Sequence, residues 1–312
     1  MKTIIIMMSL FIICQNAFCC DNCNVYLGVT PNDDRNSVSF MYRNRLMMGS
    51  YNAYGLQTML KHAAHGNDPA FWGNVISEHF NTYELRAQFL LKKRWRTSLI
   101  LPYIHNSQFI NGSDRYELNG FGDPIVLQGY QLINPYVEDD EQKAKHRLEI
   151  GAGIKLPLGK INLLNHNERP NLDLQPGTGS LDYLGYVKYI LKYKNFGATT
   201  NLNYKLNTHN AEGYRYGNTT NATLNLFYQT KVDNFTFIPT VGANIEQTNH
   251  DFSIEEHFDT GGHVIFGQLG LKVFWKTFSI FGEFQKAVSN KLKGYTQLIN
   301  KHKLNVGFAY NF

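Results

Sequence analysis

The chain has 312 residues and a modest net charge of +5, and 14% of its residues are aromatic. Lys and Arg are scattered singly, so no basic block indicates a nucleic-acid partner. Beyond the amino-terminal segment, no apolar run approaches the roughly 18–20 residues that a membrane-spanning helix requires. The composition therefore excludes a nucleic-acid-binding domain and a helical membrane protein.

The amino terminus has the pattern of a secretory signal peptide. Lys2 precedes the apolar run Ile4–Ile13, and Ala17 occupies the −3 position of a cleavage site after Cys19. We therefore predict that residues 1–19 are removed. The mature chain then enters an oxidising compartment, the periplasm of a Gram-negative cell.

Two cysteines follow this site in a periplasmic head that we assign to residues 20–36. Cys20 and Cys23 form a C-x-x-C pair, which makes a local disulfide, remains as two thiols, or binds a soft metal ion. One such pair supplies only half of a tetrahedral ligand shell. Metal binding would therefore need further ligands.

Further metal-compatible side chains lie in residues 47–76, which show no sustained strand period. His62 and His65 are three residues apart, so on a helical turn they would share a face, and methionines occur nearby. Imidazole with thioether suits copper, and imidazole alone suits zinc or nickel. This leaves open an alternative function in metal binding or handling; apart from such an ion, we expect no cofactor.

From Ser37 onward, apolar and polar residues alternate with the period of two that is typical of strands. Twelve segments show this pattern: Ser37–Leu46, Glu78–Leu91, Trp95–Ile104, Asp123–Ile133, Arg147–Pro157, Asp182–Tyr193, Phe196–Leu206, Thr219–Thr230, Phe235–Gln247, His263–Trp275, Phe278–Val288 and Lys301–Phe312. His105–Gly120 is expected to be a polar connection, with Pro102 at a strand end near the rim.

The last segment shows the alternation most clearly. In Leu304–Phe312 every second residue is large and apolar, and nothing follows that could cover this face. Lipid is the remaining solvent for it, and an outer-membrane strand needs roughly 9–11 such residues. The terminal aromatic Phe312 resembles the signal that the barrel-assembly machinery reads, so we expect this machinery as a partner.

The connections alternate between short and long, and the strand count is even. Both features are typical of bacterial outer-membrane barrels, which have short periplasmic turns and long outer loops. We predict an all-β fold in which residues 37–312 form a single antiparallel transmembrane β-barrel of twelve strands, in contact with outer-membrane lipid.

Charged residues occupy the phase opposite to the apolar one. Placing such cations against lipid near the midplane would cost roughly 2–4 kcal/mol each, so they must face the interior. The expected lumen or solute-path residues are Glu84, Arg86, Arg147, Glu149, Lys155, Lys188, Lys192, Lys205, Lys272 and Glu283. They form either a narrow conduit that favours anions or a packed, salt-bridged interior, because twelve strands enclose an intermediate space.

Three segments resemble a family of outer-membrane transporters labelled as belonging to the MetA pathway of phenol degradation. They are Gly120–Pro124, Gly151–Lys160 and Leu174–Tyr183, in the order of the family. The Cys20–Cys23 start is similar to a cysteine-headed subgroup, although Asn24 and Val25 stand where that subgroup shows a third Cys. The resemblance implies a channel or transporter for a small, aromatic or apolar solute.

Some outer-membrane barrels of this size are lipid hydrolases. His105 with Ser107 and His250 with Ser253 are candidate hydrolytic pairs, but neither has a glycine-framed nucleophile. We therefore predict no enzyme, and instead an outer-membrane barrel that passes a small-molecule solute.

Overall fold

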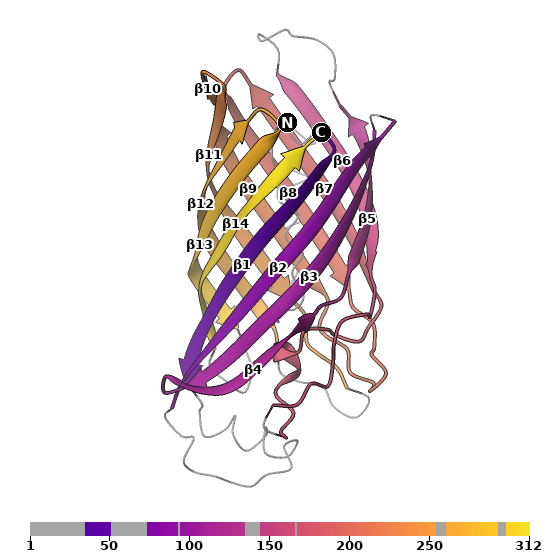
Figure 1. Cartoon of the computed structure of the whole chain (residues 1–312), viewed down its shortest axis with the longest axis vertical. Helices are drawn as coiled ribbons and strands as arrows, with labels where there is room; N and C mark the ends of the chain where they lie inside the picture. Colours follow the sequence, from indigo (N-terminus) through magenta and orange to yellow (C-terminus); the bar gives the residue numbers. More distant parts are fainter. Residues whose placement is uncertain are drawn as a thin grey trace, which may run out of the picture.

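The computed structural model describes residues 35–50, 74–92, 94–134, 144–165, 167–253, 260–292 and 298–312. In these residues, antiparallel strands form one sheet that closes on itself (Figure 1). Residues 1–34, which include Cys20 and Cys23, lie outside the described residues, as do His62 and His65. The signal peptide and both parts of the metal hypothesis therefore stay predictions.

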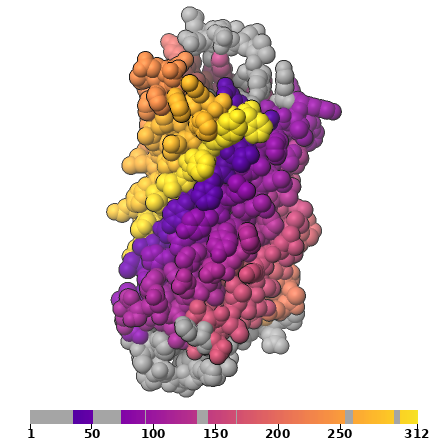
Figure 2. Space-filling model, in the orientation of Figure 1, coloured from indigo at the N-terminus to yellow at the C-terminus, as the bar shows by residue number. Residues whose placement is uncertain are grey.

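The strands follow the chain around the barrel. They are β1 Ser37–Ser50, β2 Val75–Leu91, β3 Trp95–Ile110, β4 Ser113–Phe121, β5 Ile125–Ile133, β6 Lys145–Lys155, β7 Asp182–Tyr193, β8 Phe196–Leu206, β9 Thr219–Tyr228, β10 Thr230–Val232, β11 Phe235–Thr248, β12 Gly262–Trp275, β13 Phe278–Leu292 and β14 Ile299–Asn311. β14 lies side by side with β1 (Figure 2), and β9 pairs with β11, so the wall is closed.

The wall has twelve strand positions, as predicted, because β4 continues the line of β5 and β10 that of β9. The prediction for His105–Gly120 is wrong. It forms the outer half of β3 and most of β4, joined by a turn at Asn111 and Gly112 with φ of 53° and 80°. Asn-Gly is the preferred pair for such a type I′ hairpin turn. Because its outward side chains include the polar His105 and Glu117, this hairpin lacked the apolar phase of the other strands.

Pro102 marks an interruption of the wall and lies inside β3, not at a strand end as predicted. β3 pairs with β5 up to Ile100 and with β4 from Tyr103 onward. The Pro102 carbonyl accepts a hydrogen bond from Gly122 N at 2.9 Å, so the side of Pro102 that lacks an N–H faces the β4–β5 break. A proline is tolerated there because the ladder needs no donor at this point.

The outside of the barrel carries an apolar belt. Leu85, Leu202, Leu224 and Phe308, on the outward phase of their strands, are between 43% and 55% exposed. Aromatic rings line one end of the belt through the contacts Trp95–Tyr130, Phe196–Tyr228, Trp275–Phe278 and Tyr310–Phe312. An apolar belt with aromatic girdles is the exterior of an outer-membrane barrel, and the protein is located in the outer membrane.

The two ends of the barrel differ. Ser37 pairs with Asn311, so β1 begins where β14 ends, and the short turns Lys194-Asn195 and Lys276-Thr277 lie at the same end. Short turns mark the periplasmic side, so the long connections face outward. No helix in the described parts of the chain is long and apolar enough to cross a membrane.

Candidate functional site

The connection between β6 and β7, residues 156–181, folds into the outer end of the barrel; we call it the plug loop. Its η3 turn, Leu172–Leu174, places Leu174 in an apolar cluster with Met47, Phe80 and Leu118, where Leu174 is 1% exposed. Asn106 Nδ2 on β3 donates a hydrogen bond to the Leu174 carbonyl at 3.1 Å. The tip of the loop is therefore held inside the lumen by side chains of β1–β4.

The three segments that suggested the family resemblance meet at the base of the plug loop. Lys155 Nζ lies between the carboxylates of Asp123 and Asp182, at 3.0 and 2.7 Å. Asp123 also accepts hydrogen bonds from Thr178 N at 2.9 Å and Thr178 Oγ1 at 2.8 Å, and Ser180 Oγ donates to Asp182 at 2.9 Å. We call these five residues the anchor network.

Glycines let the three segments approach so closely. A Cβ on Gly159 would lie 2.7 Å from the Gly122 carbonyl carbon, and one on Gly177 would lie 2.7 Å from that of Gly159. Real Cβ atoms do not approach backbone so closely, so any side chain here would push the loop off the wall. The Gly-rich motifs therefore serve backbone packing.

Other outer connections hold the plug loop from above. Tyr216 OH donates a hydrogen bond to the Leu172 carbonyl at 3.0 Å, and Arg169 forms an ion pair with Glu212 at 2.6 Å. The hydrogen bond from Arg169 lowers the pKa of Glu212. Asp251 accepts from Gly217 N at 2.7 Å, and burial raises the pKa of this carboxyl. The outer mouth is thus covered by interlocked loops.

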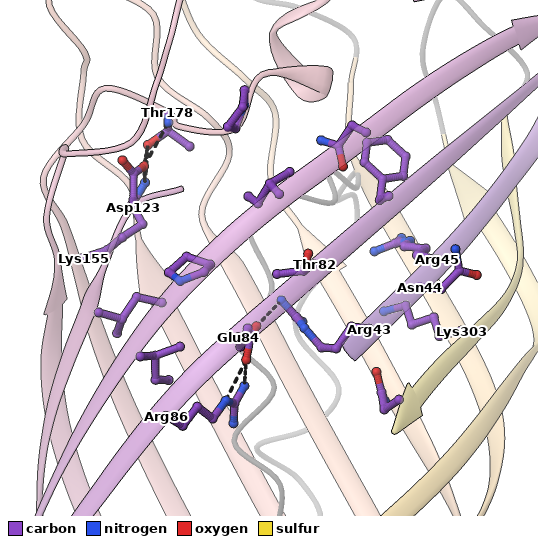
Figure 3. Close-up of a pocket in the computed structure, with 18 of the residues that line it drawn as sticks. Arg43, Asn44, Arg45, Thr82, Glu84, Arg86, Asp123, Lys155, Thr178 and Lys303 are labelled. Carbon is purple, nitrogen blue, oxygen red and sulfur yellow. Dashed lines mark hydrogen bonds and ion pairs between the residues drawn. The ribbon is translucent and has the colours of Figure 1, made fainter. Parts of the chain in front are cut away.

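Below the plug loop lies a cavity of about 90 Å³, the outer chamber (Figure 3). At its side, Glu84 is 2% exposed and receives Arg43 Nη2 at 2.7 Å and Arg86 Nε at 2.6 Å. Burying a carboxylate is tolerated when charged donors satisfy it, and here two guanidinium groups do so. Arg86 lies on β2 with Glu84, and Arg43 lies on the neighbouring strand β1.

An ion-pair cluster crosses the lumen near the outer chamber. Glu246 on β11 contacts Lys303 on β14 and Arg45 on β1, the latter at 3.3 Å. Two strands, β12 and β13, lie between β11 and β14 in the wall, so these contacts run across the lumen. The cluster narrows the barrel at this level.

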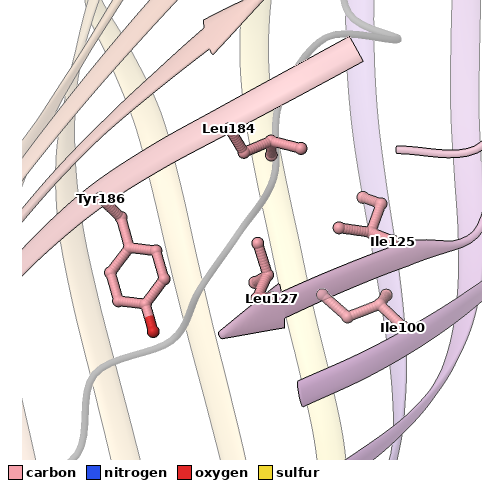
Figure 4. Packing of buried hydrophobic residues seen from close by; sticks show 5 residues of the cluster. All are labelled: Ile100, Ile125, Leu127, Leu184 and Tyr186. Carbon is pink, nitrogen blue, oxygen red and sulfur yellow. The ribbon is translucent and has the colours of Figure 1, made fainter. Parts of the chain in front are cut away.

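A second cavity of about 160 Å³, the inner chamber, lies toward the periplasm. Lys188, Lys272 and Glu283 line it, and Arg86 and Ile100 line both chambers. Between the chambers the wall carries a buried apolar cluster of Ile100, Ile125, Leu127, Leu184 and Tyr186 (Figure 4). The lumen therefore holds two chambers, and the side chains of Arg86 and Ile100 contribute to the lining of both.

All ten predicted lumen residues lie on the inward phase of their strands. Glu84, Glu149, Lys155, Lys188, Lys205 and Glu283 are buried, and Arg86, Arg147, Lys192 and Lys272 are half-buried. Several are ion-paired: Glu149, for example, binds Arg96 Nε at 2.8 Å and Tyr186 OH at 2.9 Å. Their place in a solute path stays a prediction.

Six further charged residues of the lumen were not predicted from the sequence: Arg43, Arg45, Arg96, Asp123, Asp182 and Lys303. The first three and Lys303 lie on the inward phase, so alternation could have identified them. Asp123 and Asp182 stand at strand ends, where alternation carries no signal. No group of metal-ligating side chains occurs among the residues described, and the predicted metal ligands lie outside them. His105 contacts Glu117 on the exterior of the barrel at 2.8 Å.

No family model and no curated protein matches this sequence. Its fold is similar to the COG4313 outer membrane channel from Pseudomonas putida F1, with a TM-score of 0.60 and 12% identity, covering 91% of this chain and 100% of that chain. It is also similar to the beta domain of the Bordetella autotransporter BrkA, with a TM-score of 0.50 and 9% identity, covering 90% of this chain and 100% of that one. At such identities the likeness shows the fold alone.

Proposed function

We propose that this barrel is an outer-membrane channel or facilitated transporter for a small solute, whose path runs through the two chambers. The observation that supports this most is that the outer and inner chambers share Arg86 and Ile100. A barrel stabilised only as a packed core would fill its interior with side chains, as smaller barrels do. The interior of this barrel instead contains two cavities, one after the other along the lumen.

The lining of the path supports a solute with both polar and apolar parts. Arg86 and Glu84 offer charged hydrogen-bond partners, while the buried cluster around Ile100 and Leu127 offers an apolar surface. Of the aromatic and apolar solutes that the family resemblance implies, a small apolar one agrees with this lining. Because cations outnumber acids among the predicted lumen residues, the path favours anions.

The plug loop acts as the gate in this proposal. Its anchor network holds it to β5, β6 and β7 through Asp123, Lys155 and Asp182. Passage through the outer mouth then requires the plug loop to leave the lumen. This movement breaks the hydrogen bonds from Thr178 to Asp123. A gate of this kind is a two-state element whose equilibrium the anchor network biases.

Single-channel recording in planar bilayers tests this function. The unmodified barrel should show small or brief openings that favour chloride over potassium. Asp123→Asn should give longer or larger openings, because an amide cannot accept from Thr178 and Gly159 as the carboxylate does, while the Lys155–Asp182 pair remains. Glu117→Gln, an acid-to-amide change at a 59% exposed side chain, is the matched control and should leave the openings unchanged.

The proposal fails if neither the unmodified barrel nor Asp123→Asn conducts although both are heat-modifiable, folded barrels. Cation selectivity of the unmodified barrel would contradict the charge argument. Replacing Lys188 and Lys192 with Gln should weaken the anion preference, because Lys188 lines the inner chamber and Lys192 lies on the same face of β7.

We also propose the barrel-assembly machinery as the assembly partner, read from Phe312 at the end of the closing strand. Phe312 is 53% exposed, its ring stacks on Tyr310, and its N–H donates a hydrogen bond to the Asn36 carbonyl at 2.9 Å. Phe312→Asp should reduce the amount of heat-modifiable barrel in the outer membrane without changing ion selectivity. Unchanged assembly after deletion of residues 306–312 would contradict this.

A further inference from the structure

Lys205 is set apart from the other cations of the outer chamber. It lies on the inward face of β8, lines the chamber and is 3% exposed. Among the residues that the structure describes, its Nζ has no hydrogen-bond partner. A buried ammonium group without a partner is strongly disfavoured, because it has lost its hydration without gaining another interaction.

The neighbouring cations already have anionic partners. Arg43 and Arg86 share Glu84, and Lys155 lies between Asp123 and Asp182. Lys303 is paired with Glu246. The acids of the chamber are therefore engaged, and Lys205 contributes one positive charge that they do not neutralise.

The rest of the chamber is partly apolar. Ile104, Ile125, Pro102 and Pro176 line it together with Lys205. A ligand that satisfies Lys205 therefore places its anionic group at the ammonium and its body against these side chains. Chloride would leave the apolar side without a contact, and a dianion would be repelled by Glu84 and Asp123.

The size of the chamber limits the ligand further. An apolar cavity of about 150 Å³ is known to hold benzene, whereas the outer chamber measures about 90 Å³. A carboxylate with a chain of about three carbon atoms is smaller than benzene in cross-section and carries the single charge that Lys205 lacks. An aromatic acid is too large for the chamber with the plug loop in place.

We propose that the outer chamber is a binding site for a short-chain monocarboxylate, with Lys205 Nζ binding the carboxylate and the chamber's isoleucines and prolines contacting the chain. This rests on the proposed passage of a small solute and names its chemical class. The solute pauses at Lys205 beneath the plug loop before it passes Arg86 and Ile100 toward the inner chamber.

Isothermal titration of the purified, detergent-solubilised barrel with sodium butyrate tests the site. Butyrate should bind at one site per barrel, whereas butylammonium and butanol should not, and sodium chloride should compete only weakly. Lys205→Met keeps the length of the side chain and should weaken binding at least tenfold. Lys286→Met, a change at an exposed lysine on the outward phase of β13, is the control and should bind as the unmodified barrel does.

Thermal unfolding gives a second readout that does not depend on measurable binding heat. Butyrate should raise the unfolding temperature of the unmodified barrel but not that of Lys205→Met. If Lys205→Met does not fold, an NMR experiment on the unmodified barrel replaces the comparison with this variant. The barrel should broaden the carboxyl resonance of ¹³C-labelled butyrate, and excess unlabelled butyrate should reverse the broadening.

The outcomes separate the site from the channel. No butyrate binding in a barrel that conducts would overturn the site and leave the channel standing, and equal competition by chloride would also overturn it. Binding that Lys205→Met abolishes, in a barrel that never conducts, would support the site and contradict the channel.

Discussion

The two sides of the lumen are built differently. On the side formed by β1–β3, β5 and β6, buried side chains are charged and paired, as in Arg43–Glu84, Arg96–Glu149 and Lys155–Asp123. We call this the ion-paired wall. The opposite side, from β8 to β13, also carries the buried charges Lys205, Glu246 and Glu283, but it has more buried amides than the ion-paired wall. These are Asn201, Asn203, Asn225, Asn244, Gln268 and Gln285; we call this side the amide wall.

The difference shows what each side does. Buried charges need their partners in place, so the ion-paired wall has a specific, rigid geometry. It also holds the plug loop, whose Leu174 packs on Met47, Phe80 and Leu118. Amides are less costly to bury with a bond unmade, and Asn201 and Asn203 have side-chain atoms without a partner among the residues described. In the proposed channel, these unpartnered atoms of the amide wall are the groups that would exchange hydrogen bonds with a solute.

The largest expected effect comes from breaking a pair on the ion-paired wall. Glu149→Ala leaves Arg96, which is 1% exposed, without this carboxylate, and should destabilise the barrel by about 3–5 kcal/mol. Chemical unfolding of the detergent-solubilised protein measures this. If the free energy of unfolding falls no more than after a substitution at an exposed position, the Arg96–Glu149 pair is not structurally important.

A smaller loss is expected at the plug loop. Leu174→Ala removes buried methyl groups from the cluster on β1–β4 and should cost about 2–3 kcal/mol. The plug loop packs on the ion-paired wall and is not a strand of the barrel. Weaker packing of Leu174 should therefore also release the loop more often and lengthen the channel openings. A loss of stability without any change in the channel openings would show that the plug loop is part of the core and not a gate.

The matched change on the amide wall should be milder. Asn244→Ala removes a hydrogen bond to Thr223 Oγ1 at 2.7 Å and should cost about 1 kcal/mol. The same unfolding experiment serves as the comparison with Glu149→Ala. Equal losses at the two positions would remove the distinction between the walls.

The smallest effect concerns pH at the outer mouth. The lowered pKa of Glu212 means that its pairing with Arg169 stabilises the loops above the ordinary Glu value of 4.5 and is lost as pH falls through the lowered value. Openings should therefore lengthen only in acid, as the pH falls below the ordinary Glu pKa of 4.5 and through the lowered pKa of Glu212. Glu212→Gln should remove this dependence of the openings on pH. If the dependence persists in the variant, it arises from another group, such as Asp251.

Much of the fold could be predicted because lipid and water impose a period of two on every spanning strand. This alternation correctly predicted that Phe308 faces outward and that Lys205 faces the interior. It failed for the β3–β4 hairpin around Asn111 and Gly112, because that hairpin extends beyond the lipid and needs no apolar face.

By itself, the sequence determined the strand number, the faces and the alternation of short and long connections between the two ends of the barrel, because each depends on residues close together in the chain. Only the tertiary structure decided which inward charges pair. Glu246 meets Arg45 across the lumen, and Lys155 meets Asp123 and Asp182 at the base of the plug loop. Closure of the barrel sets these distances, and so it also decided that Lys205 has no partner among the residues described.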